Sequence, residues 1–135
     1  MAVVVDASAI AAIAFGEPEG PTLAAHLAGE TLMAPGLVDY ELANIAWRKA
    51  RAHPEVIASV RAALEAAMHL PIARVSVPAV EMFRIAHETG LTAYDASYLW
   101  LARTHDAELV TLDKQLARTS GANHVGRHVG GARRD

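Results

Sequence analysis

The stretch Met1-Ala-Val-Val-Val-Asp6-Ala-Ser8 decides the fold. Its three valines form a β-branched run without polar alternation, which is typical of a strand buried on both faces inside a parallel sheet. Ligands of open α/β sheets bind in the crevice beyond the carboxyl ends of the strands. Asp6 stands at such an end, so we expect the functional groups of the chain to gather around it.

The composition indicates a folded domain. The chain has 135 residues, and its hydrophobic fraction of 53% excludes a disordered protein. No stretch approaches the roughly 20 apolar residues of a membrane-spanning helix, and the first residues lack the features of a secretory signal. There are no cysteines, which excludes disulfides and thiolate metal sites. We therefore expect a soluble, cytoplasmic protein.

The order of the predicted elements favours an α/β fold. Short apolar runs predict strands at 3–5, 31–34, 71–75, 108–111 and, weakly, 123–125. Helical patterns and their stop signals predict helices at 7–15, 22–28, 37–52, 56–68, 78–88, 92–105 and 113–118. Strands that alternate with helices are typical of a parallel sheet covered on both faces. No repeat or linker divides the chain, so we expect one domain.

Four acidic residues stand out because of where they fall. Asp6 follows the first predicted strand and Asp113 follows the fourth. Asp95 lies in the first turn of the helix before the fourth strand, and Glu41 lies in the apolar stripe of a long helix. In a parallel sheet the ends of the first and fourth strands open on the same side. We therefore expect the four carboxylates to converge.

Each acid also has a purely structural interpretation. The three aspartates can cap helices; Asp95, for example, can complete a capping box that begins with Thr92. Glu41 can form an ion pair with Arg48, which lies on the same helix face. For any single aspartate, capping is the better interpretation. A buried acid such as Glu41 favours a site, because acids are seldom buried unless they are paired or bind a metal.

Repulsion among the acids predicts a bound cation. Two carboxylates about 4 Å apart repel by roughly 4 kcal/mol at an effective dielectric of 20, so four of them require raised pKa values or a divalent ion. A site with only oxygen ligands suits Mg²⁺ or Mn²⁺. Ser8 and Thr111 are hydroxyls beside the strand-end acids and are candidate supporting groups. Ordinary turn and cap hydrogen bonding is an equally good interpretation of both.

Four segments resemble the PIN-domain ribonucleases, and among them the VapC-type toxins of toxin–antitoxin pairs. The segments are V-V-D-A-S, Y-E-L-A-N, L-T-A-Y-D-A-S-Y-L-W-L-A and L-V-T-L-D-K-Q-L. The resemblance runs from Val3 to about Val125 and implies a PIN-like three-layer fold, with a central parallel sheet of four to five short strands flanked by helices. We expect a single PIN-like nuclease domain at 1–125. The basic, Gly- and Arg-rich segment 126–135 has no counterpart in the family pattern, and we expect a flexible tail there.

The resemblance also implies an activity. PIN-domain ribonucleases hydrolyse RNA phosphodiester bonds endonucleolytically with carboxylate-held Mg²⁺ or Mn²⁺. The family pattern assigns the metal-site and catalytic acids to Asp6, Glu41, Asp95 and Asp113, of which Asp113 is the least strictly required. The family further suggests a homodimer and inhibition by a VapB-like antitoxin, whose tail can place an arginine near the acids.

Three basic residues on the predicted helix at 37–52 are candidates for holding the RNA backbone: Arg48, Lys49 and Arg51. Contacts of basic side chains with phosphates contribute affinity and salt dependence but no choice of sequence. We expect the choice of substrate to depend on exposed single-stranded regions of the RNA.

Two other classes of function remain open on the sequence alone. An aspartate-based phosphotransfer or phosphatase domain also places acids at strand ends, although the strand at 71–75 ends without an aspartate and Ser8 stands where a dehalogenase-type enzyme has a second one. A non-catalytic module with an acidic groove can bind a basic peptide. Four aromatic residues can line such a groove, although helical spacing more often places aromatics in the core: Trp47, Tyr94, Tyr98 and Trp100.

Overall fold

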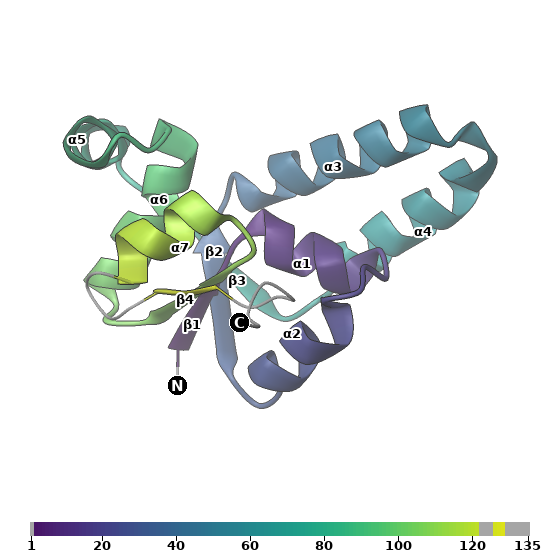
Figure 1. Ribbon diagram of the computed structural model, residues 1–135, viewed down its shortest axis with the longest axis horizontal. Coiled ribbons are helices and arrows are strands. Elements are labelled where there is room, and N and C mark those ends of the chain that lie inside the picture. Colours follow the sequence, from purple (N-terminus) through teal and green to yellow (C-terminus); the bar gives the residue numbers. More distant parts are fainter. Residues whose placement is uncertain (1, 122–125, 129–135) are drawn as a thin grey trace.

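A parallel sheet forms the centre of the protein, as the order of elements predicts. The computed structural model describes residues 2–121 and 126–128, and within them five strands pair in the order β3-β2-β1-β4-β5 (Figure 1). The strands are β1 (Ala2–Val5), β2 (Thr31–Pro35), β3 (Ile72–Val75), β4 (Glu108–Thr111) and β5 (Gly126–His128). The valines of β1 are buried, with 2% exposure at Val3 and none at Val4 and Val5. The first strand is therefore the covered, central strand that its composition predicts.

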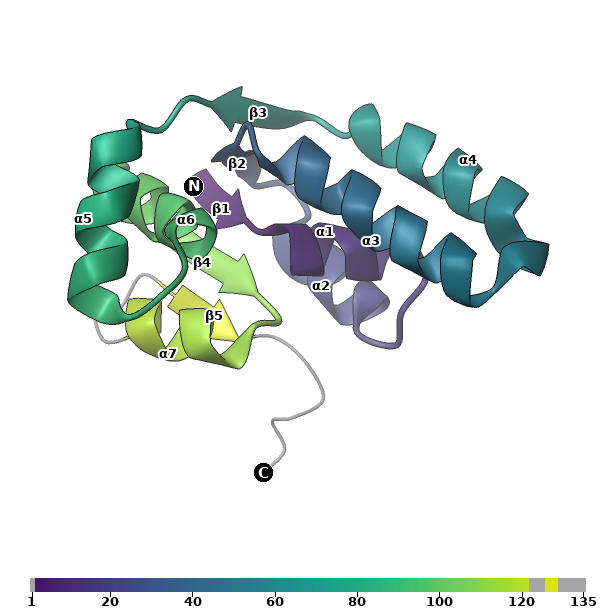
Figure 2. The ribbon, with the colours of Figure 1, turned by 90° about the horizontal axis from the view of Figure 1, so that it is seen from above.

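Helices cover both faces of this sheet. They are α1 (Ala7–Ala14), α2 (Gly20–Leu27), α3 (Val38–Ala52), the 3₁₀ helix η1 (Pro54–Val56), α4 (Ile57–Met68), α5 (Ala79–Thr89), α6 (Ala93–Thr104) and α7 (Lys114–Gly121). Figures 1 and 2 show α1 to α4 on one side of the sheet and α5 to α7 on the other. The hairpin of α3 and α4 extends beyond the sheet (Figure 2). No described helix combines the length and the apolar character needed to cross a bilayer.

The order in which the chain adds strands to the sheet reverses next to β1. From β1 it proceeds to β2 and β3 on one side, and it then returns to β4 and β5 on the other. Strand β1 pairs with β2 through Val3 and Leu32, and with β4 through Val5 and Val110. A crevice forms at such a switch point because the helices after neighbouring strands diverge to opposite faces. The carboxyl ends of β1 and β4, where Asp6 and Asp113 follow, border this crevice.

The last strand differs from its prediction. The weak strand predicted at 123–125 lies outside the described residues. Strand β5 pairs with β4 through Leu109 and Gly126, so Gly126–His128 belong to the sheet and not to a flexible tail that begins at residue 126. The segment Gly-Arg-His lacks the β-branched and aromatic residues that indicate a strand. The segment forms a strand because the edge of β4 offers backbone groups with which it can pair.

Gly20 allows the first two helices to approach closely. A Cβ atom at Gly20 would lie 2.6 Å from the carbonyl oxygen of Ala12 in α1, and a backbone atom cannot move away without shifting its helix. We expect Gly20→Ala to lower the free energy of unfolding by about 1–3 kcal/mol, as overpacking does. Urea denaturation measures the change. Gly36→Ala is the control, because a Cβ there meets no atom within 4 Å; equal stability of both variants would contradict the prediction.

Candidate metal and nuclease site

Asp6 begins the site, at the junction of β1 and α1. Its backbone N–H donates to the carbonyl of Val110 at 3.2 Å, which continues the pairing of β1 with β4. Its carboxylate accepts the N–H of Ala9 at 3.1 Å and caps α1, as one of the structural interpretations predicts. The side chain is only 5% exposed. A capping role and a place in the site are therefore compatible for Asp6.

The hydroxyls of Ser8 and Thr111 fix the orientation of the Asp6 carboxylate. Ser8 Oγ donates to Asp6 Oδ1 at 2.7 Å, and Thr111 Oγ1 donates to Asp6 Oδ2. Each hydroxyl also accepts a backbone N–H from the loop after β4: Ser8 from Leu112 at 3.0 Å, and Thr111 from Asp113 at 2.9 Å. The two hydroxyls thus connect the β1–α1 junction to the β4–α7 junction. Their hydrogen atoms point to Asp6 and not to a ligand.

The other two aspartates also lie where helices begin. Asp113 accepts the N–H of Leu116 at 2.8 Å and so caps α7. The hydroxyl of Thr92 accepts the N–H of Asp95 at 3.1 Å at the start of α6. The cap predicted for Asp113 is therefore present, whereas at the start of α6 the cap is Thr92, and no described hydrogen bond of the Asp95 carboxylate completes a capping box. The Asp95 carboxylate is half-buried and that of Asp113 is exposed.

Glu41 is held by a partner that the sequence did not indicate. The hydroxyl of Tyr98, from α6, donates to Glu41 Oε1 at 2.6 Å. Among the described residues no ion pair joins Glu41 to Arg48, so the alternative interpretation of Glu41 as the partner of Arg48 does not hold, and the favoured place in a site remains. Tyr98 lies one turn after Asp95 on α6, and this spacing was the signal that could have placed it beside the acids.

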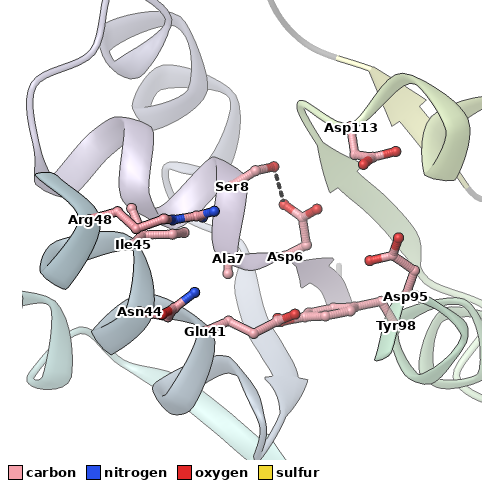
Figure 3. A pocket seen from close by; sticks show the side chains of 10 residues that line it. All are labelled: Asp6, Ala7, Ser8, Glu41, Asn44, Ile45, Arg48, Asp95, Tyr98 and Asp113. Atoms are coloured by element: carbon pink, nitrogen blue, oxygen red, sulfur yellow. Dashed lines mark hydrogen bonds between the residues drawn. The ribbon is translucent and has the colours of Figure 1, made fainter. Parts of the chain in front are cut away.

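The four acids line a single pocket. Figure 3 shows Asp6, Asp95 and Asp113 on one side of it and Glu41 reaching in from α3. The cavity measures about 290 Å³, and its lining consists of Asp6, Ala7, Ser8, Glu41, Asn44, Ile45, Arg48, Asp95, Tyr98 and Asp113. The predicted convergence of the carboxylates is therefore present. Within residues 2–121 and 126–128, however, no three acidic or histidine side chains are already arranged as ligands of one metal ion.

Burial is the main reason that three of the acids have raised pKa values. Burial, opposed by the hydrogen bonds from Thr111, Ser8 and Ala9, raises the pKa of Asp6 from 3.8 to about 6. Burial also raises the pKa values of Glu41 and Asp95, and neighbouring carboxylates raise them further.

Only one of the three candidate RNA-binding cations faces the pocket. Arg48 lines its wall. Lys49 forms an ion pair with Glu17 and lies 5.6 Å from the ring centre of Phe15. The Arg51 guanidinium lies 5.1 Å from the ring centre of Trp47.

The aromatic residues divide between core and surface. Tyr98 is 1% exposed and Trp100 packs against the core, as helical spacing predicts. Trp47 and Tyr94 are 54% and 64% exposed, so the prediction of core positions is wrong for both. Trp47 contacts the guanidinium of Arg51 on the same helix, and Tyr94 lies in the first turn of α6. Asn44, which lines the pocket beside Glu41, was not singled out from the sequence.

The raised pKa of Asp6 predicts a stability that falls as pH rises. Between pH 4 and pH 6 the folded protein retains a proton that the unfolded chain has released, so the free energy of unfolding decreases through this range. A shift of about two units corresponds to roughly 3 kcal/mol above pH 6. We expect Asp6→Asn to become more stable than the wild type, by an amount that grows from pH 4 to pH 7.

Urea denaturation of both proteins in EDTA at four pH values in this range measures the difference. Taking the difference between variant and wild type cancels the titration of distant groups. A difference that stays constant or shrinks as pH rises would contradict the assignment of a raised pKa to Asp6.

The comparisons with known proteins agree with this geometry. The model of the PIN domain matches residues 3–122. A VapC ribonuclease of Mycobacterium bovis is 37% identical over 122 residues, which are 89% of this chain and 92% of that protein. A protein of Pyrobaculum aerophilum named exonuclease VapC9 is 36% identical over 97 residues, which are 71% of this chain and 73% of that protein.

A solved structure shows the same fold. The crystal structure of PAE2754 from Pyrobaculum aerophilum superimposes with a TM-score of 0.77 and 31% sequence identity, over 96% of this chain and 90% of that one. The family model covers the chain from β1 to the end of α7, and the relatives cover most of the chain. The chain therefore belongs to the PIN-domain family and, within it, to the VapC proteins.

Proposed function

We propose that the protein is an endoribonuclease that acts as the toxin of a VapBC-type toxin–antitoxin pair. The observation that carries the proposal is the convergence of four carboxylates in one pocket at the switch point of the sheet. The ribonuclease names of its relatives support the same reaction. Membership of this family favours a nuclease over both a phosphotransfer domain and a non-catalytic peptide-binding module.

The donor set of the pocket fits a divalent metal ion. The acids offer oxygen ligands only, which suit Mg²⁺ or Mn²⁺, and three of them carry pKa values raised by burial and by neighbouring carboxylates. Asp6, Glu41, Asp95 and Asp113 would hold the ion. When bound, such an ion activates water and neutralises charge that develops on a phosphate.

The side chains of the protein have separate tasks in this proposal. Ser8 and Thr111 hold Asp6 in one orientation, so its carboxylate needs no reorganisation when a ligand arrives. Tyr98 holds Glu41 by donating its hydroxyl hydrogen. Burial and the charge of Glu41 raise the pKa of Tyr98, so this phenol remains a donor throughout the physiological range.

The acidic pocket also suits a protein partner. A VapB-like antitoxin with a basic tail would find uncompensated carboxylates there, and an arginine in that tail would occupy the place of the cation. We further propose that the protein acts in the cytoplasm, where it meets RNA, and that it forms a homodimer as its family resemblance implies.

Cleavage of RNA by the purified protein, free of antitoxin, tests the proposal. We expect cleavage of a mixed-sequence transcript with Mn²⁺ or Mg²⁺ and none in EDTA. Asp6→Asn should lower the rate at least a hundredfold, because it removes a charged group that meets the reacting centre. Asp39→Asn is the matched control: Asp39 lies on α3 with Glu41 but forms its ion pair with Arg74, away from the pocket.

Circular RNA separates two modes of cleavage. An endonuclease linearises it, whereas an exonuclease leaves it intact, which matters because one relative is named an exonuclease. Cleavage that persists in Asp6→Asn or in EDTA would contradict the four-acid site. Intact circular RNA beside degraded linear RNA would contradict the endonucleolytic mode alone.

Tyr98 should influence the reaction through Glu41. The hydrogen bond from Tyr98 lowers the pKa of Glu41, so in Tyr98→Phe this pKa rises further and less carboxylate is available. We expect kcat/KM to fall about tenfold at the acidic end of the pH profile, since a hydrogen bond to a charged group contributes roughly 1.5–3 kcal/mol, and the loss to shrink as the pH rises. Tyr40→Phe, at an exposed tyrosine of α3, is the control. A loss that does not depend on pH would indicate a packing defect.

A further inference from the structure

The basic residues of α3 differ in what they already contact. Lys49 is engaged by Glu17 and Phe15, and Arg51 lies over Trp47. Arg48 is exposed, and within residues 2–121 and 126–128 no hydrogen bond or ion pair of its side chain is recorded. Its guanidinium is therefore available to a ligand, whereas its two neighbours are held by the protein.

Arg48 and Asn44 occupy the wall of the acid pocket that α3 supplies. Glu41, Asn44 and Arg48 follow at intervals of three and four residues, so they form one stripe on the helix. Figure 3 shows the amide of Asn44 and the guanidinium of Arg48 directed from α3 into the pocket. Seven residues of helix separate Glu41 from Arg48 by about 10 Å along the axis. The stripe thus has an acid at one end and a cation at the other.

Arg48 does not pair with the acids. Within residues 2–121 and 126–128 no hydrogen bond or ion pair joins its guanidinium to the four carboxylates, although it lines the same pocket. A cation that lines an acidic pocket without pairing with the acids can bind an anionic group of the substrate. Guanidinium groups bind phosphates through two parallel hydrogen bonds.

We infer that Arg48 binds a phosphate of the RNA strand next to the bond that is cleaved, with Asn44 bonded to the nucleotide between that phosphate and the acids. The two residues are positioning residues, and α3 defines the direction in which the strand crosses the pocket. This inference rests on the proposed RNA cleavage and narrows it, because of the three basic residues of α3 only Arg48 then contacts the substrate, while Lys49 and Arg51 are structural.

Binding of RNA tests the inference independently of cleavage. The probe is a fluorescent, single-stranded RNA of 20 randomised nucleotides with Mg²⁺, titrated into Asp6→Asn protein, which does not cut it. Adding Arg48→Ala should weaken binding about tenfold, the loss of one charge-assisted contact. The slope of log affinity against log salt should fall by about 0.7, as expected for one phosphate of a single strand.

Further variants separate charge from shape. Arg48→Lys should retain the salt slope but bind more weakly than arginine, because lysine lacks the two-pronged geometry. Asn44→Ala should weaken binding without changing the slope, since asparagine carries no charge. Arg61→Ala is the matched surface control on α4, where Arg61 lies near Glu65 and outside the pocket; its affinity and slope should equal those of the Asp6→Asn parent.

The outcomes distinguish this inference from the proposed function. Unchanged affinity and slope in Arg48→Ala would overturn the inference, and so would an equal loss in Arg51→Ala or Lys49→Ala.

If the wild type cleaves RNA while Arg48→Ala has an unchanged KM, the inference fails and the proposed function stands. If the wild type cleaves nothing yet Arg48→Ala loses binding and slope, the phosphate contact stands and the proposed cleavage fails. Urea denaturation of each variant confirms that it is folded.

Discussion

The buried carboxylate of Asp6 is the constraint on which the rest of the site depends. It ends the central strand, caps the first helix through Ala9 and accepts the hydroxyls of Ser8 and Thr111. These bonds connect two strand ends that are far apart in the sequence, and they hold the loops after β1 and β4 in a fixed relation. The cost is a carboxylate with a pKa raised to about 6. Functional sites often contain groups with shifted pKa values, because function requires a charge at a position where burying it destabilises the fold.

The positions of the other acids follow from the same topology. In a parallel sheet each helix begins near the carboxyl edge, so the amino ends of several helices meet there. Glu41 and Asp95 lie in the first turns of α3 and α6, and Asp6 and Asp113 cap α1 and α7. The positive ends of the helix dipoles favour the ionised carboxylates. They do not fully offset burial and repulsion, since three of the pKa values remain raised, and a divalent cation would add to the compensation.

Much of the fold and of the acid cluster was predictable from local sequence. The valine run and the acid after it identify a strand end, and parallel topology brings Asp113 to the same edge. Helix boundaries agree to within a few residues because glycines, prolines and caps mark them. Asp95 is not itself the cap of α6: the Thr92 hydroxyl accepts the Asp95 N–H, and this leaves the Asp95 carboxylate available to the site.

Other features were not predictable, because they depend on contacts between distant residues. The bond between Tyr98 and Glu41 joins positions 57 residues apart. The spacing of Tyr98 after Asp95 can place it near the acids, but it does not pair Tyr98 with Glu41. The engagement of Lys49 by Glu17 depends on how α3 lies against the loop after α1. Without these contacts the three cations of α3 look equivalent in the sequence. Strand β5 forms from residues with little strand preference, because β4 offers an edge.

The central claim is that the four carboxylates form one divalent-metal site organised by Asp6. Calorimetric titration of Mn²⁺ into the metal-free protein tests it directly. At pH 7 the account predicts binding that weakens at least tenfold in Asp6→Asn, and at pH 6 a release of protons to the buffer, because Asp6 is then about half protonated. Absence of Mn²⁺ binding, or equal affinity in the wild type and in Asp6→Asn, would contradict the account.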